Sequence, residues 1–477
     1  MKISKYLNEK NVNNLINIVI IFLVCFIPFR EYISYYTISY IKFLPDIIIF
    51  VTFVFLLLFK KIKIRFSASD IIILLFVLLT FITNICHNQI GILPFLLELR
   101  SLFLYYLLYY ILRNTKIEIN WNLFSKVLSL VILIVSIFSI VEKIFNKDFL
   151  FPNAWASSIV YKDNFARVYS VFNNPNTYAT FIVLSFFLLN YLEYYKDVKC
   201  YKFIYVLLLI NLWLSASRSS MIILAMYILV YLILLIKNRN KSKLLGLLII
   251  VLISLICIFG ISKMSNNYYF ATVVDKKTAG VIDVIIDANG HRHNNSLNPN
   301  SNKDNSLNPN SNKDNSDIID DIAKRESGGL INRILSLFKG NIYDLSAKDG
   351  RIYKIMIGIK VFKDYPVTGS GFGTFGDSAS LIINPIDFYE TYDLEDNFYS
   401  DNQYLTIIVE CGILGTVLMV AFVISLIIKY RKNILKLTVI FCIMILCLFY
   451  NTLEVQIAMF MFYLFLCLPE KEIINEK

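Results

Sequence analysis

Residues 401–428 read DNQYLTIIVECGILGTVLMVAFVISLII, a polar start followed by a long apolar run. A helix needs about 20 residues to cross the hydrocarbon core of a bilayer, and this run is long enough. Asp401 and Asn402 stand where the run begins. The stretch therefore predicts a membrane-crossing helix whose first residues face a soluble loop.

The rest of the chain repeats this kind of run. Its 477 residues are 57% hydrophobic, with a mean hydropathy of +0.62. The runs are continuous, whereas a transmembrane barrel would show alternating segments of about 10 residues. Composition predicts an all-α integral membrane protein with about twelve transmembrane helices. The predicted spans are residues 14–30, 41–59, 70–86, 91–112, 122–142, 177–193, 201–216, 219–236, 244–261, 402–428, 434–450 and 453–468.

These spans divide the chain into three parts. Residues 1–261 hold the first nine helices, and residues 402–477 hold the last three with a short tail. Between the ninth and tenth helices, residues 262–401 form one large loop. Basic residues cluster in every second loop between the spans, so the positive-inside rule predicts cytoplasmic termini and a large loop on the opposite side of the membrane.

The large loop has two contrasting segments. NSLNPNSNKD is repeated within residues 291–316, and a polar tract of this kind predicts disorder because it cannot bury a core. Residues 351–363 place apolar side chains on one helical face and add basic residues, which predicts an amphipathic helix. That helix either lies on the membrane surface or packs on top of the bundle.

The charge and the cysteines exclude several classes of protein. The net charge of +11 comes largely from the clusters beside the spans, so it does not indicate a nucleic-acid partner. Seven of the eight cysteines lie in or at the ends of apolar runs, without metal-ligand spacing. GSGFGTFG at 369–376 lacks the Lys-Ser/Thr ending of a phosphate-binding loop and predicts a turn. We therefore expect no metal, no cofactor and no nucleotide.

Three arginines are predicted to share the outer membrane face. Arg167 lies in the loop before the sixth span, Arg218 in a Ser-Arg-Ser hairpin, and Arg351 at the start of the amphipathic helix. Guanidinium groups grip phosphate oxygens with a planar fork, so a converging set would suit the diphosphate of a lipid carrier. Asp401 supplies a carboxylate at the same depth, as a general base or to orient an acceptor. Glu410 is predicted to be structural.

The order of these motifs resembles the O-antigen ligase and O-antigen polymerase superfamily. The resemblance covers most of the chain after about residue 140 and combines four features. These are Arg167 with Phe172, Pro175 and Asn176; Ser217 to Ser219; Arg351 followed by Pro366 and the glycines; and DNQYLTIIVECGILG at 401–415.

The resemblance implies a membrane glycosyltransferase that uses an oligosaccharide linked to undecaprenyl diphosphate. Arg218 and Arg351 would hold the diphosphate and act in catalysis with Asp401, while Arg167 and Asn402 would bind substrate. Membrane lipids, a chain-length regulator and a flippase are the partners that such an enzyme implies.

Within this superfamily, the residues favour a polymerase of lipid-linked repeat units for a capsular or O-antigen-type polysaccharide. Ligases carry an important histidine where this chain has Asp401, and an Asp-Asn pair is familiar there in polymerases. Ligase-type transfer to another acceptor stays open as an alternative. A glycolipid transporter is a third possibility, because Glu98 and Arg100 lie inside a predicted span.

Overall fold

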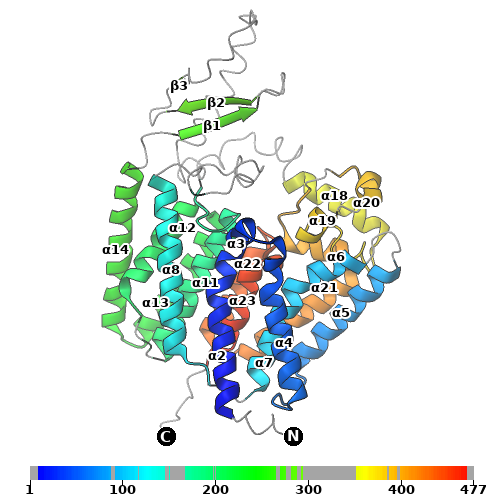
Figure 1. Ribbon diagram of the computed structural model, residues 1–477, viewed down its shortest axis with the longest axis horizontal. Helices are drawn as coiled ribbons and strands as arrows, with labels where there is room; N and C mark the ends of the chain where they lie inside the picture. Colours follow the sequence, from blue (N-terminus) through cyan, green and yellow to red (C-terminus); the bar gives the residue numbers. More distant parts are fainter. Residues whose placement is uncertain are drawn as a thin grey trace, which may run out of the picture.

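The computed structural model of the chain is a helical bundle with a small sheet at one end (Figure 1). The structure describes residues 9–86, 92–115, 118–144, 150, 167–196, 198, 200–264, 269–274, 281–286, 292–293, 351–383, 386–394 and 398–469. The polar repeat at 295–314 lies outside these residues.

The first part of the bundle consists of helices and short 3₁₀ or π segments. They are α2 (Glu9–Phe26), η1 (Ile27–Phe29), α3 (Arg30–Tyr36), η2 (Ser39–Phe43), α4 (Leu44–Leu58), α5 (Ala68–Cys86), α6 (Ile92–Leu99), η3 (Arg100–Leu104), α7 (Tyr105–Asn114), α8 (Trp121–Ile144), α11 (Pro175–Tyr195), α12 (Lys202–Ser215), α13 (Arg218–Lys237) and α14 (Lys241–Met264).

The large loop and the C-terminal helices follow. In the loop, β1 (Tyr269–Val274), β2 (Val281–Ile286) and β3 (Arg292–His293) form an antiparallel sheet in the order β1-β2-β3. The all-α prediction did not include this sheet, which lies outside the bundle. The later helices are α18 (Arg351–Asp364), α19 (Ser378–Ile383), α20 (Ile386–Tyr392), α21 (Gln403–Tyr430), α22 (Ile434–Cys447), η6 (Thr452–Glu454) and α23 (Gln456–Leu466).

The helices identify a multi-pass membrane protein. Eight described helices, some joined end to end, are long and apolar enough to cross a bilayer, and three shorter apolar helices accompany them. α11 is long enough but more polar, and it is surrounded by other helices. Most of the predicted spans agree with these helices within a few residues. The first differs, because helical structure continues past residue 30 into α3.

α21 is not a continuous helix. Gly412 has φ +61° and ψ −164°, which interrupts the helix and leaves neighbouring backbone groups without helical partners. The segment after α18 supplies these partners: Pro366 O and Val367 O accept from Ile413 N and Leu414 N at 3.0 and 3.1 Å. Gly371 N donates to Glu410 O at 3.0 Å. The glycine-rich turn is therefore built into the membrane part of the bundle.

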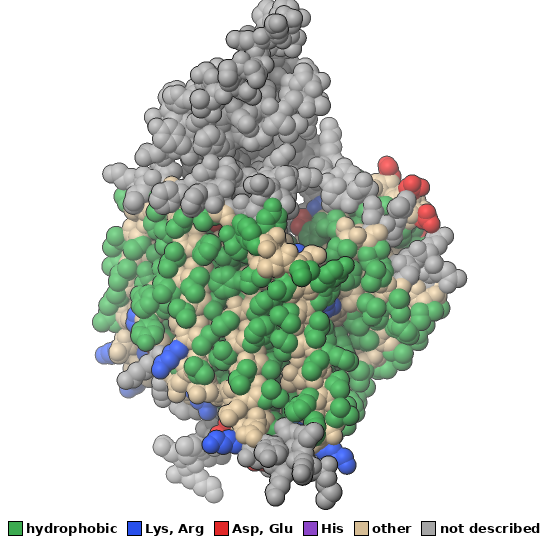
Figure 2. All heavy atoms as spheres, in the orientation of Figure 1, with side chains coloured by type: hydrophobic (Ala, Val, Ile, Leu, Met, Phe, Trp, Pro, Cys, Tyr) green, Lys and Arg blue, Asp and Glu red, His purple; other side chains and the backbone are tan. Residues whose placement is uncertain are grey.

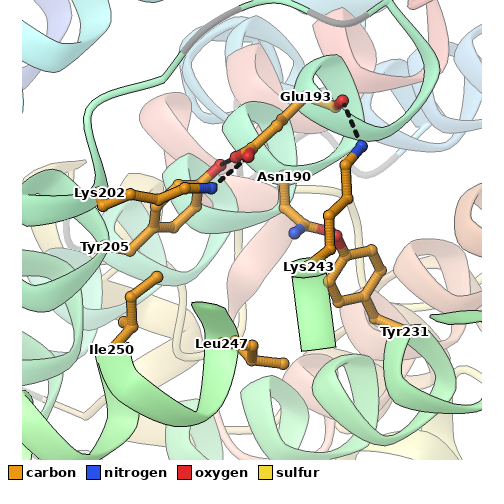
Figure 3. A pocket seen from close by; sticks show the side chains of 8 residues that line it. All are labelled: Asn190, Glu193, Lys202, Tyr205, Tyr231, Lys243, Leu247 and Ile250. Atoms are coloured by element: carbon orange, nitrogen blue, oxygen red, sulfur yellow. Dashed lines mark hydrogen bonds and ion pairs between the residues drawn. The ribbon is translucent and has the colours of Figure 1, made fainter. Parts of the chain in front are cut away.

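The two ends of the bundle differ. Helices α18–α20 cap one end, over α6 and α21 (Figure 1). A broad hydrophobic band covers the visible face of the bundle, and Lys and Arg side chains gather toward the opposite end (Figure 2). There, Glu193 on α11 accepts hydrogen bonds from Lys202 and from Tyr205 OH in a small pocket (Figure 3). Its backbone oxygen accepts from Lys243 Nζ at 3.1 Å, which ties α14 to α11.

Candidate functional site

The start of α21 carries the first part of the site. Asn402 is the N-cap: its Oδ1 accepts from Tyr404 N at 3.1 Å and from Leu405 N at 3.2 Å. This satisfies two backbone donors that a helix start leaves unpaired. Asp401, just before it, adopts φ +52°, a left-handed conformation that Asp tolerates better than most residues. The turn aims the Asp401 side chain toward α18.

Asp401 pairs with a residue that the sequence did not single out. Lys354 Nζ donates to Asp401 Oδ2 at 2.7 Å, and the side chains are 19% and 36% exposed. Lys354 stands one helical turn after Arg351, at the beginning of α18. Since residues three apart share a face of a helix, positions 351 and 354 stand on the same face of α18.

α18 packs on one face and exposes another. Val361 is fully buried in a small core, which we call the cap core, together with Phe375, Phe388, Tyr389, Tyr392, Leu394, Phe398 and Val409. Ile355, Met356 and Ile359 are exposed. Exposed Val367 and Leu414 continue this apolar surface onto α21, with Leu414 N donating to Val367 O. The predicted amphipathic helix therefore packs on the bundle and also presents an apolar face at the edge of the hydrophobic band.

Arg167 is a buried clamp between two segments. Its Nε donates to Ser215 O at 2.8 Å, and its Nη2 donates to Asn176 Oδ1 at 2.7 Å. Only 8% of the residue is exposed. Asn174 caps α11, because its Oδ1 accepts from Asn176 N at 2.8 Å. Arg167 therefore fixes the start of α11 against the turn between α12 and α13.

That turn presents Arg218. Ala216 has φ +50° and ends α12, and α13 begins at Arg218, whose side chain is exposed. Ser217 Oγ donates to Asn176 Oδ1 at 3.3 Å, so the same amide that holds Arg167 also holds the turn. The predicted tight hairpin is present, and it places Arg218 at the first turn of a helix.

A group of aromatic and polar residues connects this turn with the start of α21. The hydroxyls of Tyr450 and Thr177 lie 3.4 Å apart, and the rings of Tyr450 and Tyr399 are 6.1 Å apart. Asp401 lies within electrostatic range of both tyrosines. Burial raises the pKa of Tyr450 to about 12, so its hydroxyl stays protonated near neutral pH. The segments that carry Arg167, Arg218 and Asp401 therefore converge around Tyr450.

Four buried carboxyl groups form a further cluster, which sequence reasoning missed as a set. Glu98, Asp377, Glu410 and Glu454 come from four segments, and each is at most 8% exposed. Glu454 Oε2 accepts from Ser378 N at 2.8 Å and Oγ at 2.6 Å. Burial, with the charge of Asp377, raises the pKa of Glu454 to about 8, and burial also raises the pKa of Asp377. In the part of the chain that the structure describes, His, Cys, Asp and Glu form no group that could hold a metal ion.

Glu410 has the structural role that its position suggested. Its Oε1 accepts from Thr374 N and Phe375 N, both at 2.7 Å. Nearby, Asn84 on α5 exchanges two hydrogen bonds with the backbone of Phe372. The glycine segment is thus held by side chains from two membrane helices. Hydrophobic spacing alone gave no signal for these long-range contacts.

The two charged residues of the fourth predicted span do not form a contact ion pair with each other. Arg100 Nε lies 3.3 Å from Asp46 Oδ2 on α4. Glu98 lies near the carboxyl groups of Glu454 and Asp377, and the positive charge of Arg100 also acts on it. Arg100 and Glu98 therefore each interact with residues of other segments.

The comparison with known families agrees with this arrangement. Residues 203–420 match the family described as O-antigen ligase, a stretch that runs from α12 into α21 and includes Arg218, Arg351, Asp401 and Asn402. Arg167 lies before it. A search of curated proteins finds no match. The family match over residues 203–420, together with the membrane helices, supports the resemblance of this chain to the O-antigen ligase and O-antigen polymerase superfamily.

Proposed function

We propose that this protein polymerises lipid-linked oligosaccharide repeat units of a capsular or O-antigen-type polysaccharide. The growing glycan would leave undecaprenyl diphosphate and pass to a hydroxyl of an incoming lipid-linked unit at the outer face of the cytoplasmic membrane. The observation that carries the proposal is the Lys354–Asp401 pair at the start of α21, next to the convergence of the α12–α13 turn on Tyr450.

The reaction needs two things from the protein. The acceptor oxygen forms a bond to the anomeric carbon while the bond from that carbon to the diphosphate oxygen breaks, so negative charge grows on the diphosphate. Cations placed at that oxygen lower the barrier because they bind the transition state more strongly than the substrate. The acceptor hydroxyl also loses a proton, which a positioned carboxylate can accept.

The residues divide between these tasks. We assign Arg218 and Arg351 to the diphosphate, because one is exposed at a helix start and the other begins α18 beside the site. Asp401 receives the proton, with Lys354 holding Oδ2 so that the second oxygen points to the acceptor. Arg167 and Asn402 act as positioning residues in this scheme, since their hydrogen bonds fix the two helix starts.

A polymerase fits Asp401 better than a ligase does. A carboxylate paired with Lys354 can accept a proton from a sugar hydroxyl at neutral pH, whereas the resemblance places a histidine at this position in ligases. The charge distribution supports the proposed orientation: the Lys and Arg side chains gather at the end opposite α18–α20, and basic ends face the cytoplasm. The site then opens outside, where the polymer is assembled.

The experiment is a complementation test. A strain that lacks the gene receives the wild type, Arg218→Gln, Asp401→Asn or the matched control Lys363→Gln, an exposed cation at the far end of α18. The size distribution of surface polysaccharide is compared at equal amounts of membrane-inserted protein. We expect single units with the first two variants and long chains with the wild type and control. Long chains with Asp401→Asn would refute the assigned role.

The alternatives give different products in the deletion strain. Long but unattached chains would indicate a ligase. Accumulation of unit-bearing lipid on the inner leaflet would indicate a transporter. Single units on lipid at the outer face are the result that a polymerase predicts.

A further inference from the structure

A second group of cations lies at the same end of the bundle, apart from the site described above. Arg30 begins α3, Lys42 lies in η2 and Arg100 opens the π-helical segment η3. Glu31 and Asp46 accompany them, and we call these five residues the Arg100 cluster. They come from the first, second and fourth predicted spans, with Glu31 directly after the first. None of them was assigned a role by the family match, which begins at residue 203.

The cations of this cluster outnumber its carboxylates. Arg30 and Lys42 both pair with Glu31, at 3.0 and 2.7 Å, and Arg100 pairs with Asp46 at 3.3 Å. The positive charges of Arg30 and Arg100 act on each other. Asp46 and Glu31 offset part of this repulsion, but the two carboxylates leave the three cations with one positive charge in excess.

Several polar atoms of the cluster have unused hydrogen-bonding capacity. Among the described residues, Arg30 Nη1, Arg100 Nε and both oxygens of Asp46 are buried atoms without a hydrogen-bond partner. The Arg100–Asp46 contact is therefore an ion pair without a hydrogen bond. Buried donors of this kind are costly unless a ligand satisfies them. The side chains of Arg30 and Arg100 nevertheless stay 15% and 22% exposed, so a ligand can reach them.

The backbone at Arg100 also departs from a regular helix. The span is α-helical up to Leu99 and again from Tyr105, and residues 100–104 between them are π-helical. Such single-turn bulges are rare and frequently occur at functional sites. Arginine forks match phosphate oxygens, so the ligand chemistry that suits the cluster is a diphosphate.

The Arg100 cluster and the first site both have neighbours at η6 or at the start of α23. Gln456, which starts α23, lies beside Asp46, and Glu454 at the end of η6 accepts from Tyr399 OH at 3.5 Å. The charges of both Arg100 and Glu454 act on Glu98. A polymerase must hold two lipid diphosphates at once, one on the donor and one on the acceptor.

We propose that Arg30, Lys42 and Arg100 bind the diphosphate of the second lipid-linked glycan, the acceptor, while Arg218 and Arg351 bind that of the donor. This assignment rests on the polymerase proposed above. It gives the enzyme two separate basic sites, and a ligase whose acceptor carries no diphosphate would not need the second.

The test counts bound ligand on the full-length protein in phosphatidylcholine nanodiscs. Radiolabelled undecaprenyl diphosphate is the probe. We expect two molecules per chain for the wild type, one for Arg100→Gln and one for Arg218→Gln. The matched control is Arg113→Gln, which removes the arginine of the Arg113–Asp70 pair at the opposite end and should leave two. One molecule on the wild type, or two on Arg100→Gln, would overturn the second site.

Asp46→Asn separates a binding role from a purely structural one. The substitution removes the carboxylate that competes with a diphosphate for Arg100, so binding at the second site should tighten several-fold. A structural ion pair predicts the opposite, a less stable protein with no gain in affinity. Asp70→Asn is the control and should not tighten binding.

Two further outcomes distinguish the proposals. If Arg218→Gln and Arg351→Gln leave two molecules bound while Arg100→Gln leaves one, the donor site proposed above is wrong and the second site stands. If inorganic pyrophosphate displaces the lipid from the second site at equal concentration, the site serves a soluble diphosphate and the acceptor assignment fails.

Discussion

Lys354 Nζ lies 2.7 Å from Asp401 Oδ2 and so joins the first turns of α18 to the start of α21. The pair is partly exposed, and exposed ion pairs contribute only about 0–1 kcal/mol to stability. The main effect of the pair is therefore to orient the Asp401 carboxylate. The contact holds the Asp401 carboxylate in one direction at the place where the large loop meets α21.

Removing either partner should separate activity from stability. We expect Lys354→Gln to lower the polymerisation rate about ten-fold by misplacing the carboxylate, and Asp401→Asn to lower it about 10²-fold or more by removing the base. The midpoint of thermal unfolding should move little in both. The rate is measured with purified protein and lipid-linked units. A large drop in the unfolding midpoint would mean that the pair is mainly structural.

The broken helix predicts unequal effects of glycine substitutions. A Cβ at Gly369 would lie 2.2 Å from the backbone of Glu410, at φ +82°. Gly369→Ala should therefore destabilise the protein by about 1–3 kcal/mol or more. Gly246→Ala on α14 is the control, because a Cβ there meets nothing within 4 Å. Thermal unfolding in detergent compares them, and equal midpoints would contradict the packing described.

Glu454 predicts a pH dependence of stability. Its pKa is raised from 4.5 to about 8 in the folded protein, so the folded state holds a proton that the unfolded state releases above pH 4.5. The contribution of Glu454 to the free energy of unfolding is therefore fully present below pH 4.5 and is lost as the pH rises toward 8. Glu454→Gln keeps an oxygen for Ser378 and should flatten this decline. Unfolding midpoints from pH 5 to 9 measure it, and an unchanged slope would count against Glu454 as the titrating group.

Arg167 and Arg218 should respond differently to lysine. Lysine cannot reproduce the fork that reaches Ser215 and Asn176, so Arg167→Lys should lower stability by about 1.5–3 kcal/mol. Arg218→Lys changes an exposed side chain and should leave the unfolding midpoint nearly unchanged. Polymer length should shorten in both. If Arg167→Lys is as stable as the wild type, the clamp is not needed for folding.

The exposed face of α18 should meet lipid. A tryptophan at Met356 lies on this face, whereas one at Lys363 lies among polar residues near the end of the helix. In nanodiscs made with brominated lipid, the Met356→Trp fluorescence should be quenched more strongly than that of Lys363→Trp. A variant without the three natural tryptophans is the background. Equal quenching would leave packing as the sole role of the apolar residues.

Local patterns predicted most of the helices and the turns. Long apolar runs predicted the spans, and the glycines at 369–376 predicted a turn. The positions of α18 and α21 also followed, since polar residues stand where each begins. Such features depend on residues close together in the chain, which a sequence displays directly.

Features that depend on distant residues were not predictable in this way. The Lys354–Asp401 pair joins residues 47 positions apart, and Asn84 reaches Phe372 across 288 positions. The four buried carboxyls came from four segments whose hydropathy gave no indication of meeting. Gly412 looked like an ordinary glycine in an apolar run, because the break in α21 depends on hydrogen bonds from Pro366 and Val367.

The hydrogen bonds between residues 366–371 and the interruption at Gly412 constrain how the protein is made. Synthesis proceeds from the N-terminus, so the glycine segment leaves the ribosome before α21 exists. Its backbone groups obtain their partners only after the later helix has entered the bilayer. The cap core, which includes Val409 of α21, must wait for the same event. The proposed site is thus assembled late in biogenesis, and a chain truncated before residue 403 would lack it.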